Sequence, residues 1–161
     1  MIQDKAYGKL LSVRGNVFWK RELSYYQKDS WRGTWRHEGG GVLINQAIHT
    51  LDLITLIGGE IESFYGSYAN YLMPDIEVED QAHITLLFKN QARGFFSATT
   101  SNTIDSPVEI DVVMEKARFK LLGETLYQLI DQAFQIIEKH ESHRQSDRAN
   151  DHISHESLSH D

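Results

Sequence analysis

The segment from Ile61 to Leu122 most constrains the fold, because it reads as five β-strands joined by short turns. Apolar and β-branched residues dominate each strand segment, and Pro74-Asp75, Asn90 and Asp105-Ser106-Pro107 mark three of the joints. Joints this short predict antiparallel pairing, since a parallel crossover needs about a dozen residues or more. The five expected strands are Ile61–Met73, Val78–Lys89, Gly94–Ser101, Val108–Glu115 and Ala117–Leu122.

Two earlier segments complete the expected core. Lys9–Trp19 is apolar and β-branched without a helical period, which indicates a further strand. In Val42–Ile57 the apolar residues recur at helical spacing, and Gly58-Gly59 supplies a stop signal. We therefore expect an α+β fold, with an open, predominantly antiparallel sheet of about six strands and the helix 42–57 packed on one face.

The C-terminal part is less regular, so we divide the chain into a domain at 1–125 and an appendage at 126–161. Leu126–Glu138 fits either a short helix or another strand pair, whereas Lys139–Asp161 is polar and histidine-rich, as in an exposed tail. His140/His143 and His152/His155 have a spacing that zinc or nickel could use. No apolar residues support that geometry, so we expect no metal site.

Composition excludes several classes of protein. The 161 residues carry a net charge of −7, without the basic surface of a nucleic-acid binder. No apolar run approaches the roughly 18 residues of a membrane span, and the N-terminus lacks the apolar core of a signal peptide. The absence of cysteine excludes disulfides and thiolate metal sites. We expect a soluble cytoplasmic protein with neither nucleic-acid nor membrane partners.

Three polar residues interrupt the apolar helix. Asn45, His49 and Asp52 stand at i, i+4 and i+7, which places them on one face of an ideal helix. His49 could exchange protons near neutral pH, and Asn45 could orient a hydroxyl or carbonyl. Asp52 could fix the tautomer of His49, or bond instead to backbone or to an arginine such as Arg32. A structural role for His49 as a satisfied core residue remains an equal alternative at this point.

The segment before the helix is polar and aromatic, which is unusual for a simple linker. Lys20–Glu38 is long for a loop without secondary structure, and such loops are usually functional. Gly39-Gly40-Gly41 follows it and could expose N–H groups to an anion. However, the chain contains neither a GxGxxG nor a GxxxxGK[ST] motif. Close backbone approach or chain reversal is the favoured interpretation of the three glycines.

Together these residues carry a resemblance to a known family. Trp31-Arg32-Gly33-Thr34-Trp35, followed by the segment Gly39–Leu53, resembles the Gfo/Idh/MocA oxidoreductases, and in particular members that act on sugars or nucleotide sugars. The similarity extends over roughly Gly8–Leu122. It implies a dihydrodipicolinate-reductase-like C-terminal domain, whose partner in the family is an N-terminal Rossmann domain that binds NAD or NADP.

The resemblance also implies residue roles. His49 would be the catalytic acid/base, and Asn45, at a position where many relatives carry aspartate, would bind substrate. Trp31, Arg32, Thr34 and Trp35 would line the substrate cleft, with Arg32 also contacting an anionic group of cofactor or substrate. Asp52, Gly39, Gly40 and Gly41 would be supporting residues.

Other expectations concern partners. The dinucleotide fingerprint and the Glu-Lys-Pro segment of the family are not found in this sequence. We therefore expect a partial chain that lacks its Rossmann domain, and that alone binds no nicotinamide cofactor and is inactive. Large residues on both sides of several strands predict a homo-oligomer through the open sheet face. These residues are Phe64, Tyr65, Tyr68, Tyr71, Phe95 and Phe96. The alternative is a non-catalytic oligomerisation or sugar-binding module.

Overall fold

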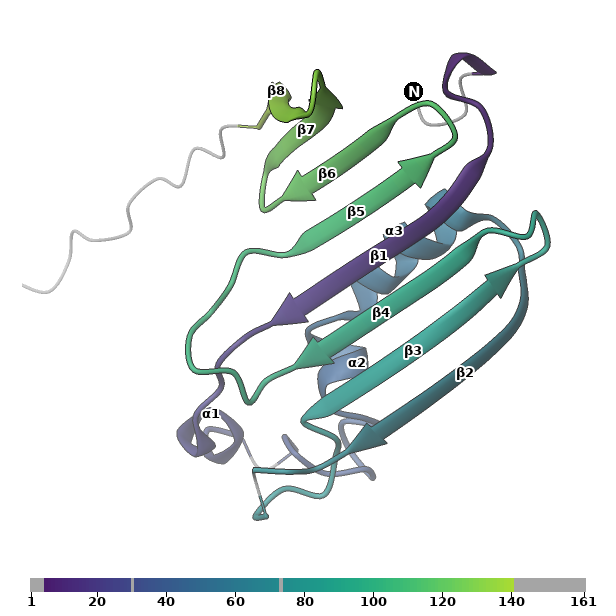
Figure 1. Cartoon of the computed structure of the whole chain (residues 1–161). Coiled ribbons are helices and arrows are strands. Elements are labelled where there is room, and N and C mark those ends of the chain that lie inside the picture. The colour runs from purple at the N-terminus through teal and green to yellow at the C-terminus, as the bar shows by residue number, and fades with distance from the viewer. Residues whose placement is uncertain (1–4, 30, 73, 141–161) are drawn as a thin grey trace, which may run out of the picture.

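The computed structural model describes residues 5–29, 31–72 and 74–140, in which one eight-stranded sheet carries the helical segment 42–58 on a single face (Figure 1). The strands are β1 (Leu10–Phe18), β2 (Ile61–Ala69), β3 (Gln81–Phe88), β4 (Arg93–Thr99), β5 (Glu109–Met114), β6 (Arg118–Leu122), β7 (Thr125–Ile130) and β8 (Ala133–Lys139). The helices are α1 (Leu23–Gln27), α2 (Val42–Asn45) and α3 (Ile48–Gly58), after a 3-10 turn at Lys5–Tyr7. The predicted α+β class with a predominantly antiparallel sheet is confirmed.

The strand order is β2-β3-β4-β1-β5-β6-β7-β8, and only the pair β1 and β4 is parallel. The five successive strands were predicted to pair antiparallel with one another. This prediction is wrong for β4 and β5, because β1 lies between them. The connection 100–108 crosses the end of β1, where the N–H groups of Asn102 and Ser106 donate to the carbonyls of Trp19 and Phe18. The lengths of the joints between β2 and β6 do not reveal that β1, from the start of the chain, occupies the centre of the sheet.

The sheet has eight strands where about six were expected, because Leu126–Glu138 adopts the strand-pair alternative. β7 and β8 form a hairpin whose two turn residues, Asp131 and Gln132, have φ values of 48° and 67°. Positive φ at both central positions is the geometry that matches the right-handed twist of the flanking strands.

The helix layer packs on the centre of the sheet. β1 turns Val13 and Val17 toward it, and both are fully buried together with Ile54 of α3. A Cβ at Gly15 would lie 2.4 Å from Cδ1 of Ile54, so the missing side chain allows α3 to approach β1 closely. No helix of the described residues lies on the opposite sheet face (Figure 1).

The predicted continuous helix over 42–57 is wrong, because α2 and α3 are separated at Gln46 and Ala47. The Val42 carbonyl accepts hydrogen bonds from both the Gln46 N–H (3.2 Å) and the Ala47 N–H (2.9 Å). The second bond spans five residues, as in a π-type bulge, a feature frequent at functional sites. Since a bulge changes the helical phase, Asn45 does not share one regular helical stripe with His49 and Asp52.

Candidate functional site

The candidate site lies on the helix side, where the glycine triplet enters α2. Glu79, 4% exposed, accepts hydrogen bonds from the N–H groups of Gly41 (2.9 Å) and Leu43 (3.2 Å) through its carboxylate. Its backbone carbonyl accepts the N–H of Val42 at 3.0 Å. The N–H groups that open α2 are therefore occupied by Glu79, and they do not form an anion cradle.

Close backbone approach explains Gly41. A Cβ there would lie 1.9 Å from the carbonyl oxygen of Glu79, far inside van der Waals contact. Gly39 instead has a φ of 79°, a left-handed conformation that glycine adopts without strain. Sequence reasoning missed Glu79. The only signal for it was the alternation of acidic residues with the apolar residues Ile76 and Val78, which the structure buries.

Acidic side chains also hold the loop before the triplet. The Gly33 N–H donates to Oε2 of Glu38, and the Trp35 N–H donates to Oε2 of Glu77 at 3.1 Å. In return, the Glu77 N–H donates to the Gly33 carbonyl at 2.7 Å. These hydrogen bonds fix the loop to the segment that precedes β3.

Arg32 is engaged within this loop. Its guanidinium lies 4.5 Å from the ring centroid of Tyr25 and 4.4 Å from that of Trp31, as in cation–π contacts. Nε donates to Asp29 at 2.9 Å and Nη1 donates to the Tyr25 hydroxyl at 2.5 Å. The hydrogen bond to Asp29 raises the pKa of Arg32, so the group remains charged. A ligand anion would compete with Asp29 for this side chain.

A pocket of about 240 Å³ opens between the loop, the triplet and β2. Trp35 and Tyr68 line it with their ring centroids 6.3 Å apart, and Gly40, Leu43 and Ile44 complete its apolar wall. Tyr68 was not predicted, because its approach to Trp35 depends on the tertiary fold.

Trp31 and Thr34, the other predicted cleft residues, stabilise the loop itself. The Thr34 hydroxyl donates to the Trp31 carbonyl at 3.0 Å, and the Trp31 ring stacks on Arg32. Neither residue lines the pocket beside Trp35.

His49 lies exposed in the first turn of α3, and its imidazole makes no hydrogen bond or ion pair with other described residues. The interpretation of His49 as a satisfied core residue is therefore wrong. Asp52, also exposed, makes no contact with it that would fix the imidazole tautomer. The exposed apolar residues Ile48, Leu53 and Leu56 belong to the same helix, and Leu56 is 73% exposed.

Asn45 closes α2 and faces the loop. Its Nδ2 donates to Oε1 of Glu38 at 2.6 Å and lies 3.3 Å from the Gly40 carbonyl oxygen. The structure thus joins Asn45 to the Trp31–Glu38 loop through Glu38, a residue that sequence reasoning did not select. Gln46, the next residue, also contacts the segment before the glycine triplet, because its Nε2 donates to the Tyr25 hydroxyl at 3.3 Å.

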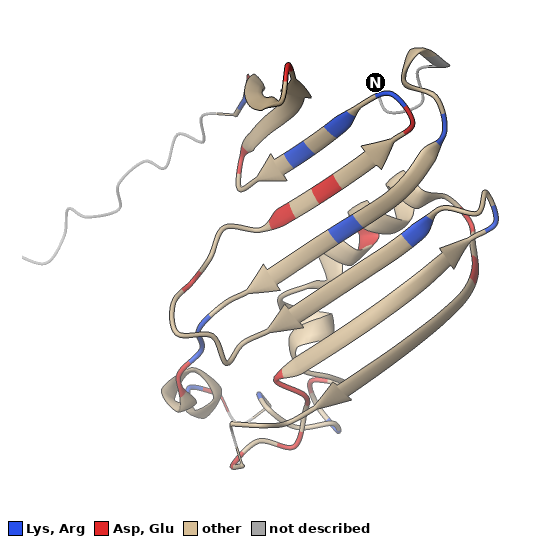
Figure 2. Cartoon of the chain, in the orientation of Figure 1, with Lys and Arg blue, Asp and Glu red and all other residues tan. Residues whose placement is uncertain are grey.

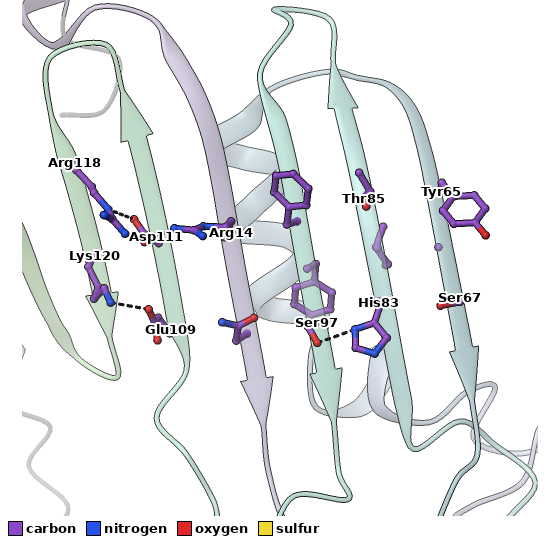
Figure 3. A pocket seen from close by; sticks show the side chains of 15 residues that line it. Arg14, Tyr65, Ser67, His83, Thr85, Ser97, Glu109, Asp111, Arg118 and Lys120 are labelled. Carbon is purple, nitrogen blue, oxygen red and sulfur yellow. Dashed lines mark hydrogen bonds and ion pairs between the residues drawn. The ribbon is translucent and has the colours of Figure 1, made fainter.

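The open sheet face carries a second concave region of about 560 Å³, lined by polar and aromatic side chains (Figure 3). Asp111 accepts hydrogen bonds from Arg14 (2.9 Å) and Arg118 (2.5 Å), and Lys120 pairs with Glu109 at 2.8 Å. These charges gather on β1, β5 and β6 (Figure 2). Burial alone would raise the pKa of Asp111, but the two arginines outweigh burial and lower it.

Metal and membrane features are absent from the part of the chain that the structure describes. No three potential ligands converge there, and no helix is long and apolar enough to cross a bilayer. Of the tail histidines weighed as a metal site, only His140 lies within the described residues.

Most of the chain matches one known protein family. The profile of the GFO/IDH/MocA C-terminal domain family matches residues 1–120. No curated protein sequence matches the chain.

The structure resembles those of two WlbA dehydrogenases solved with NADH and UDP-GlcNAcA. The Chromobacterium violaceum enzyme is 30% identical with a TM-score of 0.72, over 86% of this chain and 39% of that one. The Bordetella pertussis enzyme is 29% identical with a TM-score of 0.73, over 86% and 42%.

Levoglucosan dehydrogenase, solved with NADH and levoglucosan, shares the fold at 21% identity and a TM-score of 0.74, over 84% of this chain and 41% of that one. The chain thus spans about two fifths of the length of these structures. With a family match over residues 1–120 and a matching fold, this chain belongs to the GFO/IDH/MocA family, as its C-terminal domain.

Proposed function

We propose that this chain supplies the substrate-binding and acid–base part of an NAD(P)-dependent oxidoreductase acting on a sugar or nucleotide-sugar hydroxyl or carbonyl. One observation carries the proposal: His49 is exposed and unpaired among the described residues, on a helix that exposes apolar side chains. The WlbA relatives, solved with NADH and a nucleotide sugar, support the substrate class.

In this mechanism His49 takes the proton of the substrate hydroxyl during oxidation and returns it during reduction. Histidine is the side chain most often used in general acid–base catalysis, because an imidazole can both accept and donate a proton. Asn45 orients the reacting oxygen by hydrogen bonding. Trp35 provides an apolar wall for a sugar ring or base, with Trp31, Arg32 and Thr34 holding the loop that carries it.

We propose that this chain does not hold a nicotinamide cofactor by itself, because two groups that could bind its phosphates already have partners within the chain. The N–H groups at the start of α2 are bound by Glu79, and Arg32 is paired with Asp29. We therefore propose that NAD or NADP is held by a separate Rossmann domain of the complete enzyme. The exposed apolar residues Ile48, Leu53 and Leu56 support a domain contact on the His49 side.

We propose in addition that the open sheet face forms a homo-oligomer contact. Tyr65 and Phe95 expose aromatic rings there. Phe95 is in register with Arg14 of the Asp111 charge cluster, whereas Tyr65 lies on β2, across the face from Asp111 (Figure 3). Aromatic residues and arginine are enriched at protein–protein interfaces, and a two-fold interface brings the same patch of two copies together.

Kinetics of the complete oxidoreductase test the proposed role of His49. His49→Ala should lower kcat by about 10²–10⁴-fold, because general acid–base catalysis contributes an effect of this size. His140→Ala is the matched control, since His140 is also exposed but follows β8. Near wild-type turnover of His49→Ala, measured as NADH or NADPH formation, would exclude the proposed role.

A further inference from the structure

Glu38 contacts two parts of the candidate site with its two carboxylate oxygens. Oε2 accepts the N–H of Gly33, and Oε1 accepts the side-chain amide Nδ2 of Asn45 at 2.6 Å. Glu38 is half-buried, whereas Asn45 is exposed. The contact joins the Trp31–Glu38 loop to the last residue of α2.

The chemistry of these partners fixes the orientation of the Asn45 amide. A carboxylate and a peptide carbonyl can only accept hydrogen bonds, and Nδ2 faces both Glu38 and the Gly40 carbonyl. The amide must therefore turn its nitrogen inward. Oδ1 of Asn45 is left without a partner among the described residues, at an exposed position.

We propose that Glu38 is a positioning residue that holds Asn45 as a hydrogen-bond acceptor toward the substrate. The inference rests on the proposed function for the identity of that substrate, and it narrows the role of Asn45. A hydroxyl can donate to Oδ1, whereas a carbonyl oxygen cannot. The site thereby favours the alcohol form of the substrate at the group that Asn45 contacts. The charge of Glu38 also polarises the amide and strengthens Oδ1 as an acceptor.

The same contact gives a reason for asparagine at position 45. An aspartate there would bring a second carboxylate against Glu38 at hydrogen-bond distance, where like charges repel. A glutamine at position 38 would reverse the pair, because its amide could donate to the oxygen of Asn45. Glu38→Gln is therefore expected to turn the nitrogen of Asn45 outward.

Nuclear magnetic resonance on the chain labelled with ¹⁵N-asparagine tests the contact without requiring turnover. The Asn45 side-chain amide, assigned by its loss in Asn45→Asp, should have one proton shifted downfield by the carboxylate. Glu38→Gln should remove that shift. Glu77→Gln, which changes an equal charge that contacts Trp35 instead, should leave it in place. Should Glu38→Gln fail to fold, Glu38→Asp keeps the charge, shortens the side chain and should cause the same loss.

A double-mutant cycle gives the second measurement. Asn45→Asp should lower the thermal midpoint by on the order of 3 °C, and Glu38→Gln in the same chain should restore part of this loss. In the complete enzyme Glu38→Gln should raise KM for the alcohol about tenfold with less effect on kcat.

Unchanged Asn45 amide signals in Glu38→Gln, or strictly additive midpoints, would overturn the inference. Both results are independent of His49, so they are distinguishable from failure of the proposed function.

Discussion

Acidic side chains organise the candidate site at the scale of single residues, although only Glu79 among them is buried. The glycine triplet was visible in the sequence, and so were Asn45 and His49, because each belongs to a local pattern. Glu79 and Glu38 were not selected, since their importance comes from contacts formed by the fold. Glu79 reaches Gly41 across 38 positions of the chain, a distance that local spacing rules do not cover.

Substitution of single glycines tests this account of the triplet. Gly41→Ala should lower the free energy of unfolding by at least about 3 kcal/mol, because its Cβ would displace the Glu79 backbone. Gly39→Ala should lower the free energy of unfolding by only about 1–2 kcal/mol. The new Cβ would have no described neighbouring atom within 4 Å, so only the left-handed backbone conformation is penalised. Urea unfolding measures both. Equal losses would contradict the close-approach explanation.

At the scale of elements, the sequence predicted the strands well and their arrangement less well. Alternating apolar residues located β1 to β6 to within a few residues, since a strand's pattern is local. The insertion of β1 between β4 and β5 depends on long-range pairing and was missed. The break between α2 and α3 was missed for a related reason, since apolar spacing does not reveal a single π-type hydrogen bond.

The ion pairs that join β1, β5 and β6 predict that the stability of the chain depends on pH. Arg14 and Arg118 lower the pKa of Asp111 below its usual 3.8, so the folded state binds this proton more weakly than the unfolded state. The resulting stabilisation is present above about pH 4 and is lost as pH falls through the lowered pKa. Both arginines are partly exposed, so we expect a modest effect.

Acid titration of Asp111→Asn tests that effect. The wild-type chain should be the more stable of the two at pH 7, and the difference in unfolding free energy should shrink below about pH 4. Lys120→Gln provides a control from the neighbouring ion pair with Glu109. A difference that stays constant down to acid pH would show that Asp111 is not charged and paired in the folded chain.

At the scale of the whole molecule, the two faces of the sheet are predicted to have different partners. Exposed Ile48, Leu53 and Leu56 accompany His49 on the helix side, whereas Tyr65 and the charge cluster occupy the open face. A sequence pattern can identify large residues on both sides of a strand. It does not say which surface a second copy covers, because that depends on the assembled shape.

Light scattering during size-exclusion chromatography tests the proposed oligomer. Tyr65→Lys should shift the chain to monomer, because it places a charge on the open face. Phe64→Lys should not, although Phe64 lies on the same strand and is 76% exposed against 79% for Tyr65, because successive strand residues face opposite sides. A monomeric wild-type chain, or dissociation by Phe64→Lys alone, would refute the proposed interface.

Chemical rescue of His49→Ala by imidazole is the most direct test of proton transfer by His49. Removal of the ring leaves a space of imidazole shape beside the proposed Rossmann domain, and added imidazole can occupy that space in the complete oxidoreductase. We predict that kcat of His49→Ala rises with imidazole concentration, while wild-type and His140→Ala turnover stays constant. A low kcat that imidazole does not raise, in a variant with an unchanged fold, would contradict acid–base catalysis by His49.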